Sequence, residues 1–370
     1  MPEPTPAPPT PPSSGEISPV VPHQRRVRYT GKNPRRFEDK YKELAPERYA
    51  ADVAKVIASG KTPAGSHRPI MVQEIIKVLA LQPGEVAVDC TLGFGGHARE
   101  LLAIIAAEKS HPKGRLIGLD VDPVELPKTT ARLRATGWSD DVFTSVRSNF
   151  AGLPKILGEL GLDGADAILA DLGISSMQLD DPARGFTYKT DGPLDLRLNP
   201  QRPPSASDWL ARVSVAELTA TLRDNADEPH ADRLASELVE LRQRAPITRT
   251  KQLADAVREI LNLPKPSRDQ ETDDSSIRRV FQALRIAVND EFGVLDLFLR
   301  QLPFCLKPGG RVAILTFHSG EDRRVKQAFR DGERSGIYSR VSDEIIRAEA
   351  EELRSNPRSS SAKLRWAVRA

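Results

Sequence analysis

The chain alternates short apolar runs with amphipathic segments from residue 69 to about residue 175. Apolar runs of strand length occur at residues 85–90, 115–122, 142–148 and 165–173. A helical period marks residues 69–81, before the first run, residues 98–107, between the first and second runs, and residues 122–137, between the second and third. The alternation predicts βαβ units, and therefore a parallel sheet with helices on both faces.

The alternation stops near residue 180, where turns and amphipathic helices take over. Helical periodicity is clearest at residues 205–214, 214–225, 231–245 and 248–261. A helix at about 279–302 and a strand at 310–319 follow, and a last strand is expected at 362–370. The sequence thus predicts one α/β domain, of the Rossmann-like kind, that an all-helical insertion interrupts. We expect the first part of this domain at 61–180, the insertion at 181–280 and the second part at 281–370.

The N-terminal 60 residues differ in composition from the rest. Nine of the first 22 residues are proline, so this stretch is predicted to be disordered. Residues 24–61 are rich in lysine and arginine. They fit either a solvated tail or an arm that touches RNA, and the sequence leaves both interpretations open.

Overall composition excludes several classes of protein. With 54 Lys and Arg against 51 Asp and Glu, the formal net charge is only +3, so nucleic-acid binding has to rest on local patches. The two cysteines, Cys90 and Cys305, have no paired spacing, and no Cys/His cluster suggests a metal. No apolar run approaches the ~18 residues of a membrane span. These features predict a reduced, cytoplasmic protein without a metal or a membrane.

A glycine-rich turn, DCTLGFGGHA at residues 89–98, follows the first predicted strand and opens a helix. Such a turn presents backbone N–H groups to a ligand. Residues 93–98 fit the dinucleotide fingerprint G-x-G-x-x-A, and Asp120 ends the next strand, where a ribose-binding acid belongs. An NAD-linked oxidoreductase is therefore one interpretation.

Three strand-end carboxylates favour a different cofactor. Asp89, Asp120 and Asp171 each end a predicted strand, and the carboxyl ends of parallel strands form the ligand-binding edge of such a sheet. A carboxylate at Asp89 would repel a pyrophosphate and attract a cation. S-adenosyl-L-methionine carries an ammonium, a sulfonium and a ribose. The interpretation places Asp89 near its amino-acid end, Asp120 on its ribose and Asp171 beside its sulfonium.

Eight blocks of sequence then resemble one known family. In chain order they include HRPIMVQE, DCTLGFGGHA, GLDVDP, DLGISSMQLDDPARGF, FQALRIAVNDE and LKPGGRVAILTFHSGEDRRVK. Together they closely resemble the ribosomal RNA small subunit methyltransferase H family, also called MraW or RsmH, from about residue 67 to the C-terminus. The resemblance implies a class I methyltransferase fold that uses S-adenosyl-L-methionine. It also implies N4-methylation of a cytidine in the decoding region of 16S rRNA, with the small ribosomal subunit as partner.

The same resemblance implies a set of site residues. The cofactor contacts carried over by motif are Gly95, Gly96, His97, Asp120, Phe150, Asp171 and Gln178. Phe150 also fits an ordinary core position, and Gln178 an ordinary loop amide. For catalysis we expect Asp171 to orient the substrate amine or the cofactor, with Ser175 and Ser176 assisting. His318, which ends a strand, is a further candidate; the Ser319–Asp322 spacing after it also fits a helix capping box.

Some positions depart from the family pattern. Met177 stands where the family often has proline, Gly320 replaces a usual leucine, and Ser360 a usual arginine. Residues 275–279, SSIRR, stand where the family usually has the stretch His-Pro-Ala-Thr-Arg. These departures bear on substrate contacts rather than on the reaction. Because the helical insertion follows the fourth strand, we expect it to lie over the substrate side of the site and to act as an RNA-recognition lid. The sequence is also compatible with a homodimer. A non-catalytic ribosome-assembly factor stays as an alternative to the enzyme.

Overall fold

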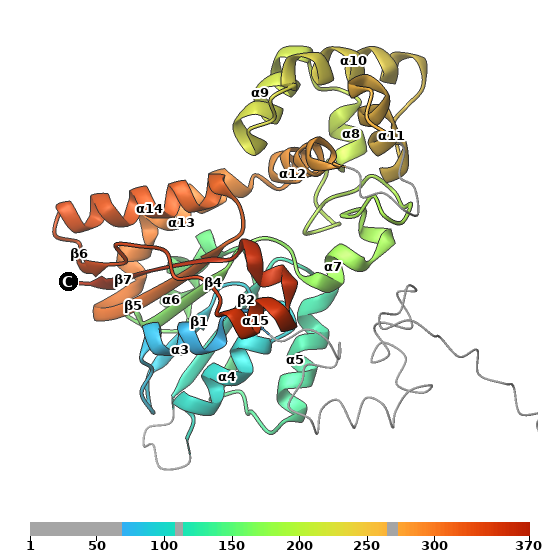
Figure 1. Ribbon diagram of the computed structural model, residues 1–370. Helices are drawn as coiled ribbons and strands as arrows, with labels where there is room; N and C mark the ends of the chain where they lie inside the picture. The colour runs from blue at the N-terminus through green and yellow to red at the C-terminus, as the bar shows by residue number, and fades with distance from the viewer. Residues whose placement is uncertain (1–68, 108–113, 265–272) are drawn as a thin grey trace, which may run out of the picture.

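A computed structural model of the chain describes residues 69–107, 114–264 and 273–370. Its centre is a seven-stranded sheet in the order β3-β2-β1-β4-β5-β7-β6 (Figure 1). The first five of these strands are parallel, and β7 runs antiparallel to both of its neighbours. The strands are β1 (Val86–Asp89), β2 (Arg115–Asp120), β3 (Phe143–Arg147), β4 (Ala165–Asp171), β5 (Leu306–Thr316), β6 (Tyr338–Val341) and β7 (Lys363–Arg369).

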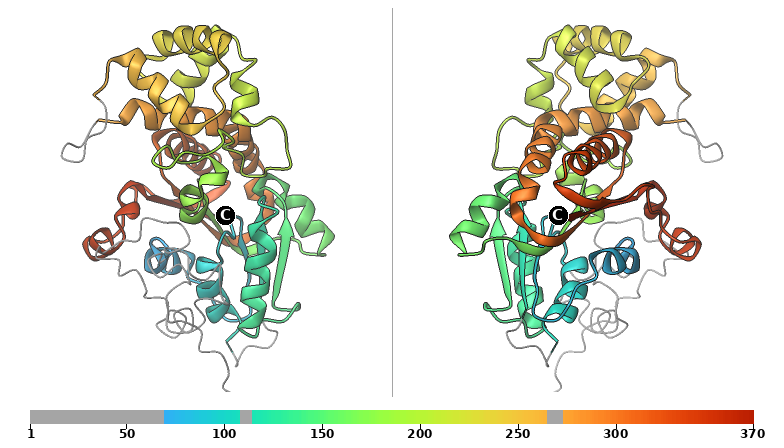
Figure 2. Two further views of the ribbon diagram at one scale, coloured as in Figure 1. Left: turned by 90° about the vertical axis from the view of Figure 1, so that its right-hand side faces the viewer. Right: turned by 90° about the vertical axis from the view of Figure 1, so that its left-hand side faces the viewer.

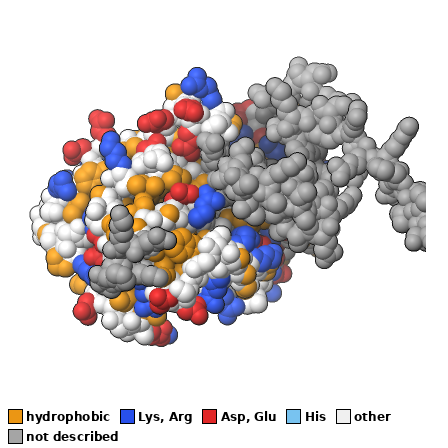
Figure 3. All heavy atoms as spheres, turned by 90° about the horizontal axis from the view of Figure 1, so that it is seen from below, with side chains coloured by type: hydrophobic (Ala, Val, Ile, Leu, Met, Phe, Trp, Pro, Cys, Tyr) orange, Lys and Arg blue, Asp and Glu red, His pale blue; other side chains and the backbone are white. Residues whose placement is uncertain are grey.

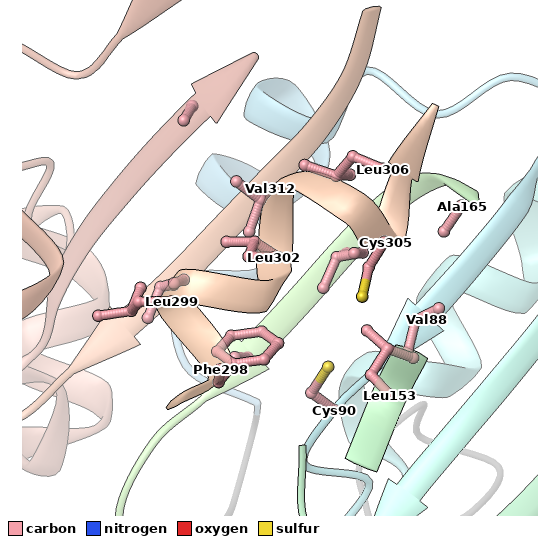
Figure 4. Packing of buried hydrophobic residues seen from close by; sticks show 14 of the residues in the cluster. Val88, Cys90, Leu153, Ala165, Phe298, Leu299, Leu302, Cys305, Leu306 and Val312 are labelled. Atoms are coloured by element: carbon pink, nitrogen blue, oxygen red, sulfur yellow. The ribbon is translucent and has the colours of Figure 1, made fainter. Parts of the chain in front are cut away.

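Helices cover both faces of the sheet, because its strands are apolar on both sides. One face packs on α3 (Val72–Leu79), α4 (Gly96–Ile105) and α5 (Glu125–Ala135). The other packs on α6 (Leu153–Glu159), α13 (Glu291–Cys305) and α14 (Ser319–Arg334). Figure 4 shows α13 placing Phe298, Leu299 and Leu302 against strand side chains of this second face. The predicted Rossmann-like sheet with helices on both faces is confirmed.

The helical insertion has a core of its own. It contains α7 (Ser176–Asp180), η3 (Pro182–Arg184), α8 (Ala206–Leu210), α9 (Val215–Ala226), α10 (Ala231–Arg244), α11 (Thr250–Leu261) and α12 (Ser275–Asn289). Its buried cluster runs from Phe186 to Leu284, so α12 belongs to the insertion beyond the boundary expected at residue 280. Both views in Figure 2 show the insertion stacked over one end of the sheet.

Several elements differ from the sequence-based expectation. The helix expected at 279–302 is two helices, α12 and α13, because Asp290 between them adopts a left-handed backbone with φ 51°. The capping box expected at Ser319 is wrong: His318 is the N-cap without a side-chain bond, and Asp322 pairs with Arg365. Helix α14 does begin at Ser319, where the capping-box spacing placed a helix start. Elements that no sequence pattern predicted include α6, β6, the short α15 (Ala350–Ser355), η2 (Phe150–Gly152) and η4 (Pro357–Ser361).

Other expectations concern composition. Cys90 and Cys305 are both buried and free, and burial raises the pKa of the Cys305 thiol to about 12. Among the described residues, no helix is long and apolar enough to cross a membrane. Acidic and basic side chains are interspersed on the described part of the face opposite the insertion (Figure 3). The Pro-rich and basic stretch at 1–60 lies outside the described residues.

Candidate functional site

A cavity of about 1330 Å³ lies between the carboxyl edge of the sheet and the insertion. The glycine turn, the ends of β2 and β4, α7, α12 and the C-terminal segment all contribute to its wall. Most of the residues expected from the sequence meet here: Gly96, His97, Asp120, Phe150, Asp171, Ser175, Ser176, Gln178 and His318 all line it. Asp89 and Gly95 do not.

The glycine turn is braced by Asp120 at the end of β2. The Gly93 amide donates to Oδ2 of Asp120 at 2.7 Å, and the Asp122 amide donates to Oδ1 at 2.9 Å. Gly93 needs its left-handed backbone, with φ 47°, to make this turn. Burial raises the pKa of Asp120 despite these bonds. A carboxylate in this setting is stabilised by hydrogen-bond donors such as ribose hydroxyls.

Gly95 and Gly96 are required by packing as well as by any ligand. A Cβ at Gly95, whose φ is 75°, would lie 3.0 Å from Cγ2 of Thr129 on α5. A Cβ at Gly96 would lie 2.8 Å from Cγ of Pro69. Gly95 therefore lets α4 start close to α5, and Gly96 lets the chain at Pro69 approach the turn.

Asp89 is buried behind the turn rather than exposed at its mouth. Its side chain is 1% exposed, and its Oδ1 accepts a hydrogen bond from the Thr91 amide at 3.1 Å. Burial raises its pKa to about 6, although the nearby His97 opposes the shift. The structure thus offers no direct contact between Asp89 and a ligand in the cavity, and the direct cofactor contact expected for it is not supported.

Asp171 and His97 face one another at the end of β4 and the start of α4. Nδ1 of His97 lies 3.6 Å from Oδ2 of Asp171, and Nε2 lies 2.9 Å from the Ile70 carbonyl oxygen. Oδ1 of Asp171 is buried without a hydrogen-bond partner among the described residues. Burial, with a contribution from Glu321, raises the pKa of Asp171 to about 7. A cation in the cavity would relieve this electrostatic cost.

Ser175 and Gln178 form the capping box of α7. The backbone N–H of Gln178 donates to Oγ of Ser175, and the backbone N–H of Ser175 donates to the side-chain Oε1 of Gln178 at 3.0 Å. Nε2 of Gln178 donates to Oδ2 of Asp122 at 2.9 Å. Gln178 is therefore already hydrogen-bonded at both ends of its amide, so its first role is to connect α7 to the end of β2.

Asp122 is a residue that the sequence analysis missed. It is 0% exposed, and it pairs with Nη1 of Arg184 at 2.6 Å. Nη2 of Arg184 donates to the carbonyls of Arg197 and Leu198. Both partners were visible, in the GLDVDP and DDPARGF blocks, but nothing local indicated that they meet.

Phe150 lies where the core beside α13 meets the cavity. It lines the cavity, and its ring packs edge-on against Phe298 of α13 with centroids 5.1 Å apart. It is thus part of the core and part of the wall that a cofactor would touch.

His318 belongs to a charged network on the α13–α14 side of the cavity. Its Nε2 lies 3.2 Å from Oε1 of Glu321, which is 4% exposed, and its ring contacts Phe292. Glu291, His318 and Glu321 offer ligand atoms within 4.8 Å of one another, as a metal site would. Arg285, however, holds Glu291 through two hydrogen bonds of 2.8 and 2.9 Å. The Arg285 guanidinium thus balances the charge of Glu291, one of the two acids in the trio.

Basic side chains lie on the insertion side of the cavity. Lys189, Arg202 and Arg278 line it, and none forms an ion pair with another described residue. Tyr188 and Phe281 lie beside them, with ring centroids 5.5 Å apart. These residues come from separate loops and helices, and the sequence analysis did not single them out. The cavity thus has an acidic floor at the sheet and a basic, aromatic rim on the insertion.

Comparison with known proteins agrees with this architecture. Residues 64–370 match the model of the MraW methylase family. A protein of Lachnoclostridium phytofermentans, named ribosomal RNA small subunit methyltransferase H 1, is 47% identical over 349 residues, covering 94% of this chain and 93% of the relative. One of the same name from Agathobacter rectalis is 48% identical over 349 residues, covering 94% and 98%. Since the match spans the glycine turn, the strand-end acids and the insertion together, the chain belongs to the MraW methylase family.

Proposed function

We propose that this protein is a cytoplasmic methyltransferase that uses S-adenosyl-L-methionine to methylate N4 of a cytidine in the decoding region of 16S rRNA. The observation that carries the proposal is the position of Asp171, whose pKa is raised to about 7, between the glycine turn and the basic rim of the cavity. The relatives named as small subunit rRNA methyltransferases support the same activity.

The floor of the cavity fits a cationic cofactor. Asp120 and Asp171 both line it, and burial raises the pKa of each carboxyl, so a bound positive charge would stabilise their ionised forms. Gly93 leaves its backbone open toward the same space, since a Cβ there would meet nothing closer than 3.7 Å. When bound, S-adenosyl-L-methionine supplies an electrophilic methyl group. Asp120 would hold the ribose, and Phe150 the adenine side.

The rim fits a strand of RNA. Lys189 and Arg202 form no ion pair with another described residue, and Arg278 interacts with Asp273 only through its charge, so the three cations are available to phosphates. Tyr188, which is partly exposed and packs on the buried Phe281, offers an aromatic surface on which a base can stack. A cytosine must leave its stack to reach Asp171, and the insertion would hold the neighbouring backbone while it does so.

The residues around the cavity suit transfer to a poor nucleophile. The N4 lone pair of cytosine is delocalised into the ring, so the chain has to orient the amine toward the methyl group. A carboxylate at Asp171 can accept an N4 hydrogen and direct the lone pair. Ser175 and Ser176, at the start of α7, lie in the same wall, and His318 lies on its α14 side.

Methyl transfer to purified small ribosomal subunits tests the proposal. Subunits lacking the modification are incubated with the protein and labelled S-adenosyl-L-methionine, and fragments of 16S rRNA are analysed by mass spectrometry. We expect one added methyl on a decoding-region cytosine N4, and at least about 10²-fold slower transfer with Asp171→Asn. Label on another atom, or none, would contradict the proposal. Subunit binding without transfer would favour an assembly factor, and calorimetric binding of NAD would favour an oxidoreductase.

A further inference from the structure

The contact between His97 and Ile70 fixes which imidazole nitrogen carries a hydrogen. Nε2 of His97 lies 2.9 Å from the Ile70 carbonyl oxygen, and a carbonyl oxygen can only accept. Nε2 must therefore donate, and in the neutral ring Nδ1 then carries a lone pair. The ring is 8% exposed, and α4 and the Pro69–Ile70 segment hold it in place.

This assignment leaves Nδ1 facing a carboxyl oxygen. Oδ2 of Asp171 lies 3.6 Å from Nδ1. With no proton between them, the two atoms present lone pairs to each other; with one proton, on either atom, they attract. Oδ1 of Asp171 is buried and unpartnered, so Oδ2 is the oxygen through which this carboxyl meets His97.

The surrounding charges favour the form that holds the proton. Asp89 on β1 lies close to both partners, Asp120 on β2 adds to the negative field at Asp89, and Glu321 on α14 acts on Asp171. Arg285, the cation that acts on Glu321, is engaged with Glu291. The His97–Asp171 pair thus sits in a negative field, in which binding one proton reduces repulsion.

We propose that His97 and Asp171 share one exchangeable proton, that the pair releases it when a cation binds in the cavity, and that the pair takes up a proton from the substrate amine. His97 is in this scheme a positioning residue that acts through Asp171. The proposal rests on the proposed function for its second half only.

The proton balance closes over one cycle. The pair loses its proton to solvent when the cavity gains a positive charge. After methylation, an N–H bond of the amine breaks, its electron pair stays on nitrogen, and the proton binds Oδ2 of Asp171, from which Nδ1 of His97 can receive it. The charge on the cofactor is by then gone, so the pair retains this proton. The next cationic ligand expels it again.

Calorimetry with two cationic ligands and one neutral analogue tests the first half without RNA. Sinefungin carries an amine where S-adenosyl-L-methionine carries its sulfonium, and S-adenosylhomocysteine carries a neutral sulfur there. Binding heats in buffers of different ionisation enthalpy give the number of protons released. Because the pKa of Asp171 is about 7, we expect the two cations to release about half a proton more at pH 7 than S-adenosylhomocysteine does. Equal proton numbers for the charged and neutral ligands would overturn the proposal.

Variants assign the proton to this pair. Asp171→Asn should abolish the difference between cationic and neutral ligands. His97→Gln keeps a donor for the Ile70 carbonyl but removes the Nδ1 lone pair that stabilises the protonated pair, so the pH of half-maximal release should move down by about one unit. His230→Gln, a change at an exposed residue before α10, is the matched control and should alter neither. An unchanged pH profile in His97→Gln would overturn the role of His97.

The two proposals fail separately. If S-adenosyl-L-methionine and its analogues do not bind, the proposed function fails. If they bind and methyl transfer to cytosine proceeds, while charged and neutral ligands release the same number of protons, only the proton-sharing pair fails.

Discussion

The buried ion pair between Asp122 and Arg184 gives the sharpest prediction about stability. Asp122 follows β2 and is 0% exposed; Arg184, at the entrance to the insertion, is 13% exposed in its side chain. The guanidinium donates to Oδ2 of Asp122 at 2.6 Å and to two carbonyls, of Arg197 and Leu198, at 3.0 and 2.9 Å. One side chain thus connects the sheet to the first turns of the insertion.

Arg184→Ala removes all three of these bonds and leaves a carboxylate buried. Gln178 and the Val124 amide would still bond to Asp122, but its ion-pair partner would be lost. Breaking a buried pair by removing one partner costs about 3–5 kcal/mol, and we expect a loss of that size in the free energy of unfolding. It is a large part of the ~5–15 kcal/mol that stabilises a typical folded protein.

The measurement is urea unfolding followed by circular dichroism. The matched control is Arg223→Ala, whose ion pair with Asp232 is exposed on both sides and should contribute ~1 kcal/mol or less. A double variant, Arg184→Met with Asp122→Leu, removes both charges and should lose less than Arg184→Ala alone. A loss below about 1 kcal/mol for Arg184→Ala, comparable with the control, would refute the reasoning.

Three further predictions follow from the same structure. Burial raises the pKa of Asp122, but hydrogen bonds from Arg184 and Gln178 outweigh burial and hold this pKa below its usual value, so the stability that Asp122 contributes is present above its unfolded-state pKa and is lost as the pH falls through its folded-state pKa. Urea titrations between neutral and acidic pH should therefore show a smaller loss of unfolding free energy on acidification in Arg184→Ala than in the unchanged protein. Asp120→Ala should weaken S-adenosyl-L-methionine binding by about 1.5–3 kcal/mol for each lost bond to the carboxylate, measured by calorimetry, and unchanged affinity in a folded variant would remove Asp120 from the site. Deleting residues 1–60 should leave cofactor binding intact while weakening subunit binding and flattening its salt dependence; equal salt slopes would make this stretch a passive tail.

Local pattern was enough to predict much of the fold. Each strand around the ligand edge is a short apolar run that ends in an acid or a turn, and each flanking helix has its own apolar period, so both are visible within a few residues. The order of elements then gave the parallel sheet, and the sheet gave a common edge for Asp120 and Asp171. Asp290 is the counterexample, since one left-handed residue divides a helix whose apolar period continues through it.

Only the tertiary structure decided how the site residues divide their roles. Asp89 ends a strand as Asp120 does, yet it is buried behind the turn, and Gly95 packs on α5 instead of facing the cavity. Arg184 meets Asp122 from 62 residues away, and His97 reaches the Ile70 carbonyl from 27. Such contacts depend on how whole elements pack, because side-chain direction and burial are set by neighbours that are distant in the chain. The sequence by itself determined which chemical groups come to the edge of the sheet; the packing determined which of them face the cavity and which hold the others in place.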